Sequence, residues 1–288
     1  MKLSLSSAQI RTIHAKIQKL ALDTGKTSMQ TLTLFLLERA AVRIVSDPLL
    51  QQSLVFKGGY VAHRVYRSPR FTHDIDAIIC NLANNVAVER IKAALSSDVG
   101  DGAWFYFEEE KRLQTQVEGG GISLVFRSGL GEPPSNLLKA LKVSIDLGVG
   151  DPVTPGPTLA HSPHSVGQGT LTWRVYTIES MLAEKLHASI TLGSRNSRSK
   201  DIFDVDFFWP QANLAVLVTA LAATFEHRVT PLPHSFVEAL KDIDTTVLRR
   251  GWQAAVAEIP NPPVFEETFK SVIANLQNLD VFITKPIN

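Results

Sequence analysis

Two short segments of this chain carry the residue types that phosphate and metal chemistry requires. Gly58-Gly59 follow an apolar strand end, and their lack of side chains allows a tight turn whose backbone approaches a ligand closely. The helix expected from Gly59 to Tyr66 would direct free N–H groups toward an anion such as phosphate. Asp74 and Asp76 then lie two residues apart, so in a strand both carboxylates point to the same face.

Neighbouring carboxylates repel each other unless a cation lies between them, and Mg²⁺ prefers oxygen ligands of this kind. A phosphate-binding turn beside a carboxylate pair is the equipment for transferring a phosphoryl or nucleotidyl group. Taken alone, Gly58-Gly59 are read as a loop, and Asp74 and Asp76 as a solvated strand edge. Their order and spacing together favour the metal site.

A third acid, Asp146, lies on the polar face of the strand expected over residues 139–147. If that strand neighbours the one with Asp74 and Asp76, Asp146 joins the pair, either to complete two-metal binding or to act as a base. The other interpretations are a surface aspartate and a salt bridge to Lys142.

Lys185 and Asp204 are expected on two helices, over residues 178–192 and 199–209. Lys185 borders an apolar stripe, so it either reaches nucleotide phosphates or extends to solvent, and the helix pattern alone favours solvent. Asp204 lies within a very apolar helix and needs a partner, for which Lys185 is the candidate. Asp201 in the first turn complements the helix dipole.

A basic loop precedes the second of these helices. Its cations, Arg195, Arg198 and Lys200, are equally consistent with ligands for triphosphate or RNA backbone and with a solvated loop. The formal net charge of the whole chain is only +1, so any RNA binding must come from such local patches.

Composition indicates an ordinary globular protein of 288 residues, with 44% hydrophobic and 20% charged residues. A single cysteine, Cys80, excludes an intramolecular disulfide and a cysteine-rich zinc site, and a reducing cytoplasm fits. The N-terminus lacks the apolar core of a signal peptide. The most apolar run, 214–225, is shorter than the roughly 20 residues that span a bilayer, so we expect no membrane partner.

The order of predicted elements indicates an α/β (α+β) fold: a mixed sheet, preceded by helices over residues 7–45 and followed by a helical C-terminal part. We place the core at 1–169 and the helical domain at 170–288, with the active site between them. Residues 108–112 are expected to form a solvated turn or edge, flanked by strands at 103–107 and 113–117. Residues 151–169 are expected to form a long loop or linker.

The glycine turn before an Asp-x-Asp strand resembles the nucleotidyltransferase superfamily. The wider motif set resembles the AbiEii/AbiGii toxin family, the nucleotidyltransferase half of bacterial type IV toxin–antitoxin pairs. The resemblance covers roughly residues 30–210 and rests on these segments in order: Lys57-Gly58-Gly59, Arg70 to Asp76, Ser144 to Gly148, Ala183 to Leu186 and Lys200 to Asp204.

This resemblance implies a reaction in which an acceptor hydroxyl attacks the α-phosphorus of an NTP and releases pyrophosphate. It implies that Asp74 and Asp76 hold Mg²⁺ or Mn²⁺, with Asp146 as the third acid, and that Lys185 and Asp204 complete the NTP site. It also adds Lys57 and Thr72 to the nucleotide-binding residues. Some family members resemble tRNA nucleotidyltransferases, so a tRNA 3′ end is the expected acceptor and a cognate antitoxin an expected partner. Two alternatives are a protein or small-molecule acceptor, and a non-catalytic module that binds RNA or a partner.

Overall fold

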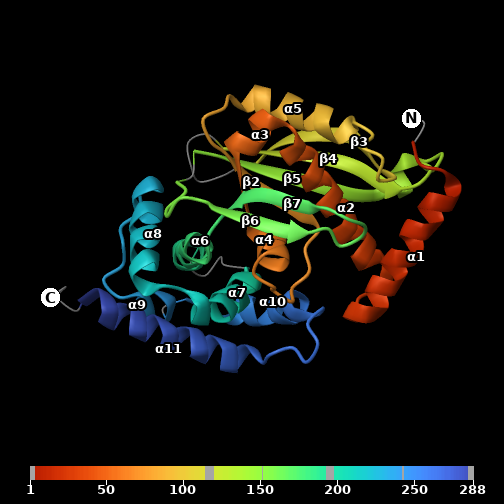
Figure 1. Ribbon diagram of the computed structural model, residues 1–288. Coiled ribbons are helices and arrows are strands. Elements are labelled where there is room, and N and C mark those ends of the chain that lie inside the picture. Colours follow the sequence, from red (N-terminus) through yellow and green to blue (C-terminus); the bar gives the residue numbers. More distant parts are fainter. Residues whose placement is uncertain (1–3, 114–119, 151, 193–197, 242, 285–288) are drawn as a thin grey trace. The chain divides into compact units, whose positions relative to one another are not determined.

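A computed structural model describes residues 4–113, 120–150, 152–192, 198–241 and 243–284 (Figure 1). The chain divides by its contacts into two compact units. The first contains Met1–Tyr66, Phe71–Gly150 and Thr158–Val175, and the second contains Arg67–Arg70, Asp151–Pro157 and Tyr176–Asn288. The chain therefore enters the second unit three times.

The first unit is built on one seven-stranded sheet in the order β3-β4-β5-β2-β1-β7-β6. Its strands are β1 Leu54–Lys57, β2 Asp74–Ile79, β3 Ala103–Leu113, β4 Gly121–Leu130, β5 Leu141–Val149, β6 Thr158–Pro163 and β7 Thr170–Val175. The β2–β5 and β1–β7 pairs are parallel and the other pairs are antiparallel. This mixed sheet, flanked by helices, confirms the predicted fold class.

Helices pack around this sheet. They are α1 Ser7–Thr24, α2 Ser28–Ser46, α3 Pro48–Ser53, α4 Gly58–Arg64 and α5 Asn84–Ser96, with the short 3-10 helix η1 at Leu137–Lys139. Gly25 ends α1 with φ +66°, a conformation that glycine adopts without steric cost. Helix α2 buries Leu36, Leu37 and Ala40 and contacts β2, β4, β5 and β7. It is therefore the main helical cover of the sheet.

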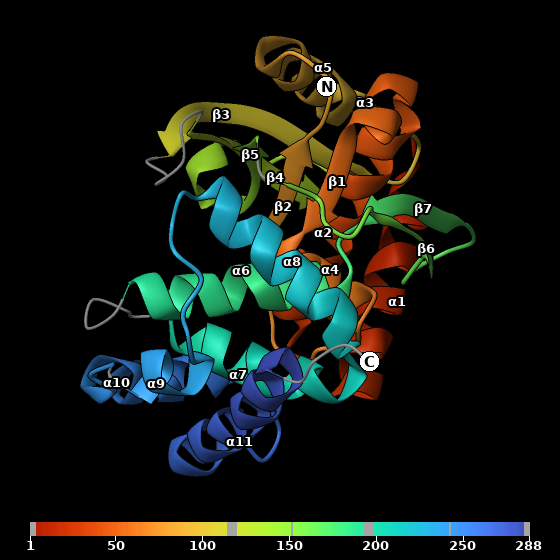
Figure 2. The same cartoon turned by 90° about the vertical axis from the view of Figure 1, so that its left-hand side faces the viewer.

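The regular elements described in the second unit are all helices, between residues 178 and 284. It contains α6 Ile178–Thr191, α7 Ser199–Phe208, η3 Trp209–Gln211, α8 Leu214–His227, α9 Phe236–Lys241, α10 Thr246–Val256 and α11 Phe265–Thr284. Helix α6 packs against α7 and α8, and α7 also contacts α10 and α11 (Figure 2). Across the described ranges, none of the helices combines the length and the apolar character that crossing a membrane requires.

The acidic run Glu108-Glu109-Glu110 lies within a strand, so the predicted turn is wrong and the predicted edge is right. Strand β3 continues through it to Leu113 and pairs with β4 along its length, with an irregularity between Phe107 and Glu109. Because β3 is an edge strand, its charged side chains can remain in water. The remainder of the strand predicted at 113–117 lies outside the described residues.

The expected loop over 151–169 contains β6, which forms the opposite edge of the sheet. Its burial alternates, with Ala160 and Ser162 buried between exposed neighbours. Pro163 closes the strand, a position where the missing N–H costs no ladder bond on an edge. Helix α5 begins after Ala83, which provides no side-chain cap.

Candidate active site

The carboxylates of Asp74, Asp76 and Asp146 share one face of the sheet. The parallel register of β2 and β5 sets Asp76 beside Asp146, and Asp74 lies two residues earlier on β2. All three are half-buried, whereas Ile75 and Ile145, which point to the opposite face, are fully buried. The sheet therefore brings Asp146 beside a pair of acids that precede it by about 70 residues in the chain.

Hydroxyl groups orient two of these acids. Thr72 Oγ1 donates to Asp74 Oδ1 at 2.5 Å, and Ser123 Oγ, opposite Asp146 on β4, donates to Asp146 Oδ1 at 2.6 Å. Burial raises the pKa of Asp146, the Ser123 hydrogen bond opposes the rise, and the charge of Asp74 adds to it. Negative charge is therefore concentrated on this face, where a cation would stabilise it.

Gly58 lies directly against Asp76. A Cβ atom on Gly58 would fall 1.9 Å from Asp76 Oδ2, and one on Gly59 would fall 2.8 Å from Thr72 Oγ1. Gly58 also has φ +69° and begins α4, while Lys57 is in register with Asp76 on the neighbouring strand β1. Only a residue without a side chain fits at Gly58, so the turn and the carboxylates form one compact group.

The donor set suits a hard divalent cation, because it consists of carboxylate and hydroxyl oxygens. Within the described ranges, however, no three His, Cys, Asp or Glu side chains converge as a cluster that could hold a metal ion. Mg²⁺ in nucleotide sites is commonly bound by one or two carboxylates together with substrate phosphates. The three acids fit this partial role rather than that of a complete protein cage.

A buried network of charges lies within the second unit. Lys185 Nζ on α6 is 2.5 Å from Asp204 Oδ2 and 2.9 Å from Asp201 Oδ1, both on α7. Asp204 is fully buried, and its carboxylate also accepts two hydrogen bonds from Arg70. The predicted pairing of Lys185 with Asp204 is therefore present, and Asp201 contributes a second acid to Lys185.

These contacts keep the groups charged. Burial alone would raise the pKa of Asp204, but Lys185 and Arg70 together lower it below its ordinary value. Burial alone would lower the pKa of Lys185, but Asp201 and Asp204 raise it above its ordinary value. Both pKa shifts have the sign expected for a formed ion pair between Lys185 and Asp204.

Arg70 is the residue to which the sequence assigned no role. It precedes Asp74 by four positions and has only 8% of its side chain exposed. The sequence did indicate that Asp204, in an apolar helix, would need a positively charged partner. Lys185 already provided one, so nothing pointed to a second. Arg70 and Asp204 are 134 residues apart in the chain, so no local sequence pattern links them.

The basic loop that precedes α7 lies only partly within the described residues. Arg195 lies outside the described residues. Arg198 and Lys200 are exposed, and Arg198 Nε is 3.1 Å from Asp201 Oδ2. Arg198 thus joins the edge of the Lys185 network, while nothing in the described contacts assigns Lys200 a ligand.

Comparison with known proteins identifies a family. The sequence profile described as nucleotidyl transferase AbiEii toxin, Type IV TA system, matches residues 39–274, well over half of the chain. The structure of JHP933 from Helicobacter pylori aligns with 16% identity and a TM-score of 0.49, covering 97% of this chain and 95% of that one. A candidate nucleotidyltransferase from H. pylori aligns with 15% identity and a TM-score of 0.46, covering 86% and 93%. No curated protein matches the chain.

Proposed function

We propose a specific reaction for this chain, which belongs to the AbiEii nucleotidyl transferase toxin family of type IV toxin–antitoxin systems. The reaction transfers a nucleoside monophosphate from an NTP to an acceptor hydroxyl, and the acceptor is the 3′ end of a tRNA. The resulting block of tRNA use arrests translation and growth. The observation that carries the proposal is the register of β2 and β5, which gathers three acids beside the Gly58-Gly59 turn.

In this proposal, Asp74 and Asp76 hold Mg²⁺ or Mn²⁺, which neutralises charge on the triphosphate when bound. Thr72 keeps the Asp74 carboxylate oriented through its hydrogen bond. Gly58 and Gly59 present backbone N–H groups to the phosphates, and Lys57 adds positive charge on the adjacent strand. Asp146, whose pKa is raised by burial, takes the proton of the attacking hydroxyl.

Lys185 neutralises the charge that develops on phosphate during the transfer. Two of its three protons are directed at Asp201 and Asp204, which orient the ammonium group and leave a third for a phosphate oxygen. Arg198 and Lys200 are further candidate phosphate contacts, as is Arg195. The roles of these cations are supported by their residue types and by the family membership.

The test is incubation of the purified protein with each labelled NTP, Mg²⁺ and total RNA, followed by sequencing of RNA 3′ ends. We expect label in tRNA and extended tRNA ends. Label in protein or in a metabolite would move the acceptor to another class. Binding of RNA without label in any fraction, with the Asp76→Ala variant binding equally well, would support a non-catalytic module. Co-expression with the neighbouring gene tests for an antitoxin, whose effect would be restored growth.

A further inference from the structure

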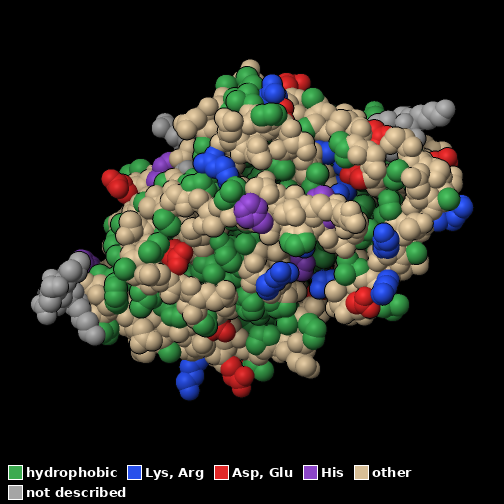
Figure 3. All heavy atoms as spheres, in the orientation of Figure 1, with side chains coloured by type: hydrophobic (Ala, Val, Ile, Leu, Met, Phe, Trp, Pro, Cys, Tyr) green, Lys and Arg blue, Asp and Glu red, His purple; other side chains and the backbone are tan. Residues whose placement is uncertain are grey.

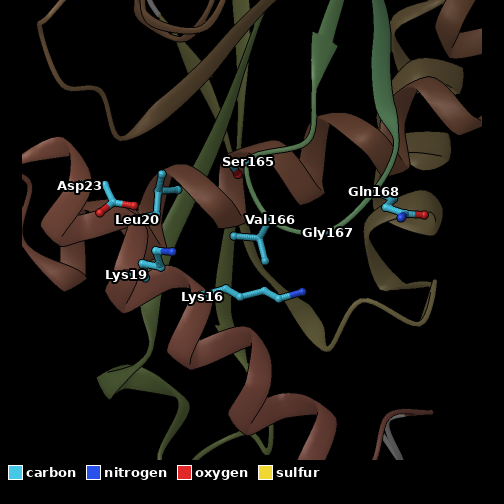
Figure 4. Close-up of a pocket in the computed structure, with 8 residues that line it drawn as sticks. All are labelled: Lys16, Lys19, Leu20, Asp23, Ser165, Val166, Gly167 and Gln168. Carbon is cyan, nitrogen blue, oxygen red and sulfur yellow. The ribbon is translucent and has the colours of Figure 1, made fainter.

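A second polar site lies in the first unit, in a pocket of about 350 Å³ between α1 and the loop that joins β6 to β7. Figure 4 shows Lys16 and Lys19 entering it from α1, and Ser165, Val166 and Gly167 forming the loop side. Both lysines are exposed. None of the residues named for the reaction lines this pocket.

Behind the loop, two arginines surround one buried carboxylate. Glu38 is 1% exposed and receives Arg39 Nη2 at 2.5 Å, Arg64 Nη2 at 2.6 Å and the Ser165 backbone N–H at 2.8 Å. Two guanidinium groups against one carboxylate leave an excess positive charge. The pKa of neighbouring His164 is lowered, mainly by burial and then by the charge of Arg39, while Glu38 opposes the shift.

Three buried polar atoms of this cluster have no hydrogen-bond partner among the described residues. They are Arg39 Nε, Arg64 Nε and the Ser165 hydroxyl oxygen. Arg39 is 6% exposed, and Ser165 itself lines the pocket. Of these three, only Ser165 lines the pocket, so its hydroxyl is the buried donor nearest to a group bound there, and an acceptor oxygen would offset the cost of leaving it unpaired. The two arginines lie behind the loop and contribute positive charge to this region without lining the pocket.

Positive charge extends beyond the pocket along α1. Arg11 and Lys19 are both exposed and lie eight residues apart, about 12 Å along a helix. Lys and Arg side chains lie over α1 at the right of Figure 3, with Asp23 the acid that lines the pocket. A row of cations of this length exceeds a single phosphate group and suits a chain of phosphates.

We infer that the pocket between α1 and the β6–β7 loop binds a backbone phosphate of the RNA acceptor, with neighbouring phosphates along α1. This inference rests on the proposed function in taking the acceptor to be RNA. The pocket provides affinity rather than chemistry, because it contacts phosphate and carries no group that the transfer reaction uses.

The test compares two double variants with the same change in charge. Lys16→Gln/Lys19→Gln removes the pocket lysines, and Lys111→Gln/Lys142→Gln removes two exposed lysines from β3 and β5. Binding of fluorescent tRNA is measured by anisotropy over a series of salt concentrations. We expect the pocket variant to bind about tenfold more weakly, with a salt slope lower by about one to two, since each phosphate contact contributes about one.

Three other results would overturn the inference. The pocket variant could match the control variant, the wild-type protein could fail to bind tRNA, or the variant could raise the KM for NTP while tRNA binding stays unchanged. The last result would assign the pocket to a nucleotide phosphate. Labelling of RNA by the wild-type protein is scored separately, so the proposed function can stand when this inference fails.

A second variant addresses the base of the pocket. Ser165→Ala removes one of the unpartnered donors without changing charge. We expect tRNA binding to weaken by about threefold with an unchanged salt slope, because a neutral hydroxyl releases no counterion. Unaltered tRNA affinity in Ser165→Ala would show that Ser165 does not contact the RNA. Unaltered tRNA affinity in both Ser165→Ala and the pocket lysine variant would overturn the inference.

Discussion

Arg70 donates hydrogen bonds to both oxygens of the Asp204 carboxylate, with Nε 2.7 Å from Oδ1 and Nη2 2.7 Å from Oδ2. The pair is buried and belongs to the second unit, yet Arg70 lies only four residues before Asp74 of the first unit. The short segment Arg67–Arg70 is thus held by contacts within the helical unit just before the chain continues into β2, which carries Asp74 and Asp76. Arg70, the first residue of the Arg70 to Asp76 motif, therefore stabilises the packing of this segment against α7.

The two-pronged contact predicts that lysine cannot replace Arg70. Arg70→Lys retains the charge but loses the planar fork, and we expect a loss of about 1–3 kcal/mol in unfolding free energy together with reduced transfer activity. Chemical denaturation and single-turnover kinetics measure both. Arg90→Lys is the matched control, because Arg90 makes a similar contact to Asp47 on an exposed surface and should cost under about 1 kcal/mol. Equal losses in the two variants would contradict the prediction.

Removing a carboxylate from β2 should abolish transfer without unfolding the protein. For Asp76→Asn we expect at least a hundredfold loss of labelled product, and a change of within about 0.5 kcal/mol in unfolding free energy, because the acids are crowded by like charge. Glu110→Gln, a change on the exposed edge of β3, is the control and should leave activity intact. An active Asp76→Asn enzyme with normal melting would refute the metal-site assignment.

Gly58 and Gly25 form a matched pair for testing the tight turn. Both have positive φ, at +69° and +66°, so alanine should cost each about 1–2 kcal/mol in unfolding free energy. A Cβ on Gly25 meets no atom within 4 Å, whereas one on Gly58 meets Asp76 Oδ2 at 1.9 Å. We therefore expect Gly58→Ala, and not Gly25→Ala, to displace Asp76 and abolish transfer. Comparable activity in both variants would show that the close approach is not required.

The charge network predicts how stability depends on pH. The folded pKa of Asp204 lies below its ordinary value of 3.8, so its stabilisation is full above that value and is lost as pH falls through the folded pKa. The folded pKa of Lys185 lies above 10.5, so its stabilisation is full below 10.5 and is lost at still higher pH. The difference in unfolding free energy between wild type and Asp204→Asn should therefore be constant from about pH 5 to 9 and shrink below about pH 4.

Denaturant titrations at several pH values measure this difference. Because removing one partner of a buried ion pair typically costs about 3–5 kcal/mol, the plateau should be large enough to resolve. A difference that rises steadily between pH 5 and 9 would mean that another titrating group controls the network.

Local pattern was sufficient for most elements and for the residue types of the candidate site. Alternating apolar and polar residues predicted the strands that became β2 and β5, because side chains in a strand alternate between faces whatever its neighbours are. The same alternation placed Asp74 and Asp76 on one face. Apolar spacing likewise predicted α6 and α7, which carry Lys185 and Asp204.

Tertiary structure decided which of these elements meet. Asp146 stands beside Asp76 because β5 pairs with β2, a contact between strands far apart in the chain that no local pattern encodes. Strand β6 forms in a segment rich in turn residues because the free edge of β7 supplies its hydrogen bonds, which outweigh a weak local preference. The contact between Arg70 and Asp204 has the same origin. The sequence alone determined that a buried Asp204 needs a positively charged partner. Only the packing of the segment Arg67–Arg70 against α7 decided that an arginine 134 residues away shares that role with Lys185.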